Sequence, residues 1–70
     1  MNATMPTLEA VRSWPATVSV PNGSSALGIS KSHGYELAAR GEFPARTIRV
    51  GHRVRVITAS LIQVLEGGVP

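Results

Sequence analysis

The chain contains no cysteine and no long apolar run. Without thiols it cannot form a disulfide, a thiolate metal site or a cysteine nucleophile, so packing or partners must stabilise the fold. Its longest apolar stretches are far shorter than the about 20 residues that span a bilayer, and no apolar run follows a basic N-terminus. We therefore expect a soluble protein that is not exported, stays in the cytoplasm and does not bind a membrane.

Carboxylates and histidines are also few. The four glutamates are scattered over separate segments and no nucleophile stands beside a base, so no catalytic constellation is visible. His33 and His52 are too far apart, without cysteines or paired carboxylates, to hold a metal. These absences predict a protein that is not an enzyme, needs no cofactor or metal, and carries both histidines on its surface.

Seventy residues are enough for one small domain of marginal stability. No internal repeat or low-complexity segment divides the chain. We predict a domain over residues 7–66, with a flexible N-terminal tail at 1–6 and a C-terminal tail at 67–70.

Both ends of this domain are expected to be helical. Thr7 can cap a short first helix, which Trp14-Pro15 ends because proline disfavours helical geometry at the preceding residue. A short strand or strap should follow at residues 16–18. Near the other end, Thr58 can cap a last helix over residues 59–66.

Two further helices with a tight turn between them are expected in the middle of the chain. The first covers residues 21–27, and Gly28 supplies the turn. Ser30 is a strong N-cap for a second helix over 31–40, which Gly41 ends. The inner face of that helix has Gly34, Leu37 and Ala38, and the outer face has Lys31, Ser32, Tyr35, Glu36 and Ala39.

Residues 47–56 alternate with a period of two, which is typical of a β-hairpin. The apolar positions are Ile48, Val50, Val54 and Val56. For all four to share a face, Val50 must pair with Val54 and Ile48 with Val56, which leaves 51–53 as the loop and Arg53 at its tip. The same register places Arg49 opposite Arg55, a like-charge pair that an anionic partner would offset.

These elements predict a mainly α fold with a small β-hairpin: a winged helix-turn-helix, with a short N-terminal helix, the helix-turn-helix, a two-stranded wing and a C-terminal helix. A helix about 10 Å across fits the ~12 Å major groove of DNA, so the second helix of the pair can read base edges while the first braces it. The expected contacts from this recognition helix are Ser30, Lys31, Ser32, His33, Tyr35, Glu36 and Arg40. Those from the wing are Arg46, Arg49, His52, Arg53 and Arg55, of which Arg53 and Arg49 are favoured for the neighbouring minor groove.

The distribution of charge points to the same partner. The net charge of +3 is modest, yet five arginines lie between Arg40 and Arg55 against the single Glu42. Clustered positive charge attracts a polyanion. If about five phosphates are neutralised, log affinity should fall against log salt with a slope of about −4 to −5.

Some of these residues have a simpler alternative role. Capping suffices to explain Ser30, and Tyr35 is explained equally well as the edge of the core. Glu36 can accept from a cytosine amino group or repel wrong registers. Trp14 is most simply a core residue.

Three runs of the sequence are distinctive: residues 18–21 (VSVP), 26–32 (ALGISKS) and 40–44 (RGEFP). They resemble the excisionase family, of the MerR-like winged helix-turn-helix superfamily, and its actinobacteriophage members in particular. Tyr35 takes the place of the family's recognition-helix tyrosine. The hairpin GHRVRV at 51–56 and the helix at 58–65 also match, so the resemblance covers about residues 7–66. The chain departs at 22–25 (NGSS), where relatives tend to carry better helix formers and an alanine pair.

The resemblance implies a recombination directionality factor in the host bacterial cytoplasm. Such proteins bind arrayed sites in double-stranded DNA beside a phage attachment site, bend the DNA, and direct a tyrosine integrase toward excision of the prophage. A single short domain has a limited footprint, so we expect cooperative self-association on DNA. The alternatives are a small winged-helix transcriptional regulator, which would more often bring a dimerisation helix or ligand domain, and a protein-binding antitoxin module.

Overall fold

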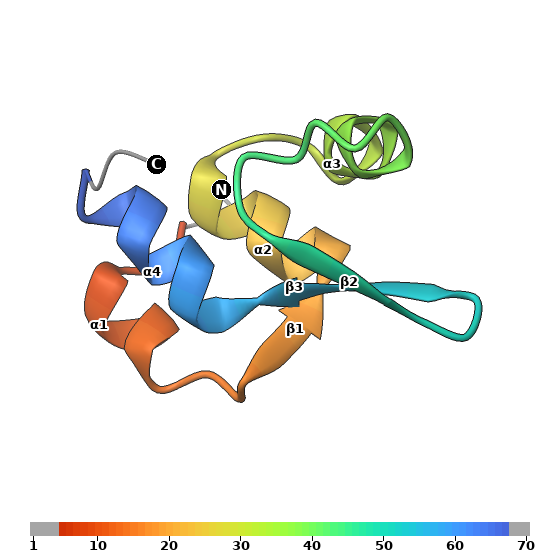
Figure 1. The fold of residues 1–70 in the computed structure, drawn as a ribbon. Coiled ribbons are helices and arrows are strands. Elements are labelled where there is room, and N and C mark those ends of the chain that lie inside the picture. Colours follow the sequence, from red (N-terminus) through yellow and green to blue (C-terminus); the bar gives the residue numbers. More distant parts are fainter. Residues whose placement is uncertain (1–4, 68–70) are drawn as a thin grey trace.

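The computed structural model describes residues 5–67. Residues 1–4 and 68–70, which make up most of the two tails predicted from the sequence, lie outside the described residues. The described chain is a small α/β domain with four helices and one three-stranded antiparallel sheet (Figure 1). In chain order the elements are α1 (Leu8–Arg12), β1 (Thr17–Ser19), α2 (Val20–Leu27), α3 (Lys31–Ala39), β2 (Thr47–Val50), β3 (Arg53–Ile57) and α4 (Thr58–Leu65).

Local sequence signals place α2 and α3. The Ser19 hydroxyl caps α2, and Gly28 ends it in the left-handed region at φ 77°, a conformation that a residue with a Cβ rarely adopts. Ser30 then caps α3 by accepting from the His33 N–H at 3.1 Å. The predicted turn and cap are thus confirmed, and so is the end of α3, where Gly41 follows the last helical turn at φ 71°.

The two helices pack closely where Gly34 of α3 meets Ser24 of α2. A Cβ placed on Gly34 would lie 1.8 Å from Ser24 Oγ and 3.0 Å from Ser24 Cβ. A Cβ here would force the Ser24 hydroxyl to rotate and would still leave a tight contact with Ser24 Cβ, so glycine suits this approach best. Gly34 therefore lets α2 come close to α3.

The sheet has the order β1-β3-β2. The segment predicted as a strand or strap is a third strand rather than an isolated strap, because Thr17, Val18 and Ser19 pair with Ile57, Val56 and Arg55 of β3. The two-stranded hairpin is therefore confirmed, and the strand before it is confirmed one residue further along the chain, where it pairs with the hairpin. The backbone hydrogen bond from the Thr58 N–H to the Ala16 carbonyl, at 2.9 Å, continues this pairing beyond the strand.

The predicted register of the β2–β3 hairpin is also wrong. Val50 pairs with Arg53 and Arg49 with Val54, so the loop has two residues, Gly51 and His52, instead of three. Gly51 at φ 62° begins this loop, in the type II′ pattern that matches the twist of paired strands. Arg49 therefore does not lie opposite Arg55, and Arg53 belongs to β3 rather than to the tip.

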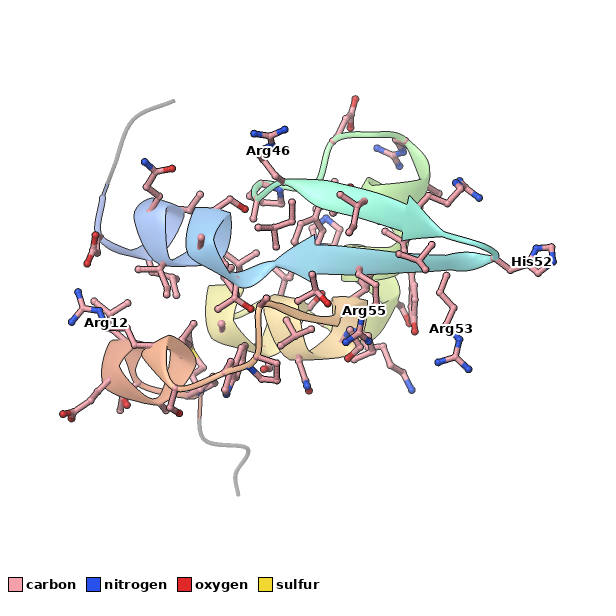
Figure 2. The ribbon with its side chains drawn as sticks, turned by 60° about the horizontal axis from the view of Figure 1, so that its bottom comes forward. Arg12, Arg46, His52, Arg53 and Arg55 are labelled. Atoms are coloured by element: carbon pink, nitrogen blue, oxygen red, sulfur yellow. The ribbon has the colours of Figure 1, made fainter. Side chains whose placement is uncertain are left out.

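The core lies between α2, the sheet and the α1–α4 pair. Its fully buried side chains include Val11, Val20, Val56 and Leu61, and Trp14 packs against them as expected. α2 comes so close to the sheet that a Cβ on its Gly23 would lie 3.0 Å from a methyl carbon of Val56. At the end of the molecule opposite the hairpin loop, an ion pair between Arg12 and Glu66 joins α1 to the residue that ends α4 (Figure 2).

Thr58 does not cap α4 as predicted. α4 begins at Thr58 itself, and its N-cap is Ile57, which has no side chain that can accept. The Thr58 side chain is buried and its hydroxyl donates to the Pro15 carbonyl at 2.6 Å, so it holds the segment before β1 against the start of α4. Within residues 5–67, no helix is long and apolar enough to cross a membrane.

Candidate nucleic-acid interface

The outward face of α3 is polar and open to solvent. Lys31, Ser32, His33, Tyr35 and Glu36 are exposed, whereas Gly34 is buried and Leu37 and Ala38 are half-buried. The two faces predicted from the helical spacing are therefore confirmed. Tyr35 is 50% exposed, so its ring is available for contact rather than enclosed in the core.

The C-terminal end of α3 carries both signs of charge. The Arg40 guanidinium lies 3.4 Å from a carboxylate oxygen of Glu36 and 3.6 Å from one of Glu42. All three side chains are more than half exposed, so these ion pairs contribute little stability. They nevertheless make this end of the helix locally anionic, and Arg40 would have to leave two carboxylates to bind a phosphate.

The hairpin carries cations on both of its faces. Because paired residues share a face, Arg49 points to the same side as Val54 and Val56, the side on which the core lies. Arg53 and Arg55 alternate with these and belong to the opposite face. The sequence-based placement of Arg49 beside Arg55 on one outer face is therefore corrected.

Arg55 is the most firmly held of these cations. Its Nε donates to Thr17 Oγ1 at 3.3 Å and its Nη2 donates to the Thr17 carbonyl at 3.2 Å, which fixes the side chain across β1. Figure 2 shows Arg55 and Arg53 projecting to the same side of β3 and His52 extending from the tip. Arg46 lies on the opposite side near the base of the hairpin, apart from Arg53 and Arg55 (Figure 2).

A groove of about 410 Å³ separates α3 from the hairpin. Its walls bring together Tyr35 from α3 and Arg49, His52, Arg53 and Arg55 from the hairpin, all of which were candidate contacts from the sequence. None of the described residues that line it carries a carboxylate. Its remaining lining residues are Ser19, Val20, Ala38, Ala39 and Val54.

Most of the cations of the described chain are not neutralised. Arg12 and Arg40 are the two that form ion pairs with described carboxylates, and the other five have no such carboxylate within 4.0 Å. These five are Lys31, Arg46, Arg49, Arg53 and Arg55. Lys31 lies at the start of α3 and the other four on or next to the hairpin, so the positive field is concentrated around these two elements.

Sequence reasoning missed part of the groove. Ser19, Ala38, Ala39 and Val54 line it, but their contribution depends on where β1 ends and on the hairpin register. The pairing that brings these segments together is not local, so residue type alone does not place them at the groove. Within residues 5–67, no group of three histidine or glutamate side chains is placed to hold a metal ion. Comparison with protein-family models, with curated proteins and with solved structures gives no match.

Proposed function

We propose that this protein is a double-stranded DNA-binding protein of the winged helix-turn-helix type. In this proposal α3 enters the major groove with its exposed face, α2 braces it through the Ser24–Gly34 contact, and the β2–β3 hairpin acts as the wing over the neighbouring minor groove. The observation that carries the proposal is the cluster of cations without ion-pair partners on α3 and the hairpin. Within the described chain, the carboxylates that form ion pairs do so with Arg12 and Arg40, and not with the cations of this cluster.

Its biological role, in this proposal, is that of an excisionase. The runs ALGISKS and RGEFP and the tyrosine on α3 support it through their resemblance to that family. The protein would bind several adjacent sites beside a phage attachment site, bend the DNA, and direct a tyrosine integrase toward excision. It would do so without catalytic residues of its own, because the chemistry belongs to the integrase.

Footprinting on the DNA that flanks the gene of this protein tests both parts of the proposal, the DNA binding and the excisionase role. The DNA should cover any attachment site and the nearby promoters, and protein and salt should be titrated together. Several protected sites in phase beside an attachment site support the excisionase role. Protection confined to a promoter makes the protein a transcriptional regulator, and no protection at any salt concentration refutes DNA binding.

A charge-reversal pair separates DNA binding from a protein-binding antitoxin role. Arg53→Glu should abolish binding to duplex DNA, because Arg53 lies beside the groove and has no carboxylate partner among the described residues. Arg12→Glu is the matched control, with the same change of charge at the far end of the molecule (Figure 2). Equal losses of affinity in the two variants would refute the assignment of the interface.

Self-association on DNA is part of the proposal, and the outer face of the hairpin is its candidate contact with a second copy. On this face Ile48 is 42% exposed and Val50 is 57% exposed, and β2 is an edge strand. An edge strand with exposed apolar side chains is a ready site for protein contact. Arg53 and Arg55 share this face, because they are paired with Val50 and Ile48, so the contact with a second copy would use the edge of β2 while the arginines of β3 stay on the DNA side.

A further inference from the structure

We infer that the groove between α3 and the hairpin binds one sugar-phosphate strand of the duplex, with Arg49 and the backbone N–H of Val54 as its phosphate ligands. This inference rests on the proposed DNA binding and assigns different parts of the DNA to different residues of the hairpin. Arg53 and His52, nearer the loop, are left for the minor groove. Arg49, which the sequence alone assigns to the minor groove, would instead contact only backbone.

The register of the hairpin places Arg49 for this role. Arg49 pairs with Val54, so its side chain lies on the inner face of the hairpin, toward the side of α3. It is exposed and has no carboxylate of the described residues within 4.0 Å. A guanidinium at this position presents several donors in a planar fork that matches a phosphate.

The end of β1 leaves a second donor in the groove. Hydrogen-bonded pairs alternate along an antiparallel ladder. On the β1 side of β3 the Thr58 N–H bonds to Ala16, so the ladder pairs Val56 with Val18 and would next pair Val54 with Val20. Val20 is instead the first residue of α2, because the capping Ser19 turns the chain into a helix. The Val54 N–H therefore points past the end of β1, beside Arg49 and Arg53.

The other edge of β3 agrees with this assignment. There the Ile57 N–H bonds to the Arg46 carbonyl at 2.9 Å, so Arg55 and Arg53 are the next residues whose backbone faces β2. Val54 faces away from β2. Among the described residues this N–H forms no backbone hydrogen bond to α2 or to a loop, and an oxyanion in the groove would satisfy it.

The remaining walls suit a sugar-phosphate strand rather than a single ion. Ala38, Ala39 and the Val54 side chain provide small apolar surfaces against which deoxyribose can pack, while the Tyr35 hydroxyl can donate to a phosphate oxygen. Between a helix in the major groove and a wing at the minor groove, the strand that separates the two grooves must pass.

The test compares Arg49→Gln with Arg12→Gln as matched control, since Arg12 is exposed at the end of the molecule opposite the hairpin loop (Figure 2). Affinity is measured by fluorescence anisotropy on a duplex from the footprinted region and on a scrambled duplex, over about 50 to 200 mM salt. Arg49→Gln should weaken binding about 10-fold on both duplexes and lower the salt slope by about 0.9. Arg12→Gln should change both quantities less.

Single methylphosphonate substitutions in the duplex then locate the contact. One neutralised phosphate should weaken the wild-type protein but have little further effect on Arg49→Gln, which is the coupling expected of a direct contact. Circular dichroism melting confirms that both variants remain folded.

Three results overturn the inference. An unchanged salt slope in Arg49→Gln means that Arg49 does not contact phosphate, although DNA binding by the wild-type protein would stand. A loss confined to one duplex means that Arg49 reads bases. If the wild-type protein binds neither duplex, the proposed function itself is refuted. This result is seen in the wild-type protein, whereas the first two are seen only in the Arg49→Gln variant.

Discussion

The contact between Ser24 and Gly34 gives the most direct prediction about stability. Ser24 is fully buried, and its hydroxyl has no hydrogen-bond partner among residues 5–67. A buried hydroxyl without a partner costs about 1–3 kcal/mol. Ser24→Ala removes the hydroxyl, leaves the Cβ in place and improves helix propensity, so we expect the free energy of unfolding to rise by about 1 kcal/mol. In a domain of this size that change raises Tm by roughly 4–8 °C.

Gly34→Ala should have the opposite effect in the wild-type background. Alanine gains about 1 kcal/mol over glycine inside a helix. The added Cβ would, however, lie 1.8 Å from Ser24 Oγ, and rotation of that hydroxyl relieves only part of the clash because Ser24 Cβ lies at 3.0 Å. With an overpacking cost of about 2–3 kcal/mol the variant loses about 1–2 kcal/mol net. A shift of α3 relative to α2 would also lower DNA affinity.

The double variant tests whether these two effects share one cause. In the Ser24→Ala background the shortest contact of the new Cβ is the one at 3.0 Å, so the clash and the gain in propensity should nearly cancel. The coupling between the two sites should therefore be about 1–2 kcal/mol, measured by urea denaturation of the four proteins. Additivity within about 0.5 kcal/mol would refute the reasoning, because it would mean that the two residues do not touch.

Three further predictions concern other contacts. Glu36→Gln should raise the affinity for any duplex a few-fold, because it removes an anionic group and one of the two carboxylates that pair with Arg40. Unchanged affinity in a gel-shift titration would exclude Arg40 from the interface. Ile48→Lys should leave single-site affinity within about twofold but lower cooperativity on an array of sites, and undiminished cooperativity would exclude the outer hairpin face as the contact. Thr58→Val should lower the free energy of unfolding by about 1–2 kcal/mol, since it leaves the Pro15 carbonyl without its donor; thermal melting measures this change, and a Tm equal to that of the wild type would contradict it.

The helical half of the fold could be predicted because its signals are local. Gly28 and Ser30 act within one turn of their own positions, so residue type alone locates the end of α2 and the start of α3. The two faces of α3 follow from the helical repeat in the same way. Capping failed only at Thr58, where burial and a bond to the distant Pro15 carbonyl outweigh the local preference.

The sheet could not be predicted in detail because its pairing is not local. The three-residue loop rested on the assumption that all four apolar hairpin residues face the core. The core is too small to cover all four residues, because the hairpin extends beyond α2. Past Thr47, the inner face of β2 borders the groove and not the core. No burial therefore draws Ile48 and Val50 inward, and the two-residue loop that begins at Gly51 sets the register.

The observed register changes the proposed roles of the hairpin arginines, but a polyanion is still the partner that we propose. Arg49 and Arg55 do not lie opposite each other, so repulsion between them does not indicate an anionic partner. The absence of acidic residues from 47 to 56 is independent of register, however, and so is the field that these arginines produce. With Arg49 on one face and Arg53 and Arg55 on the other, the hairpin is basic on both sides. A strand with this arrangement can bind the backbone through its inner face while its tip reaches the adjacent groove, which a hairpin with all its arginines on the outer face could not do.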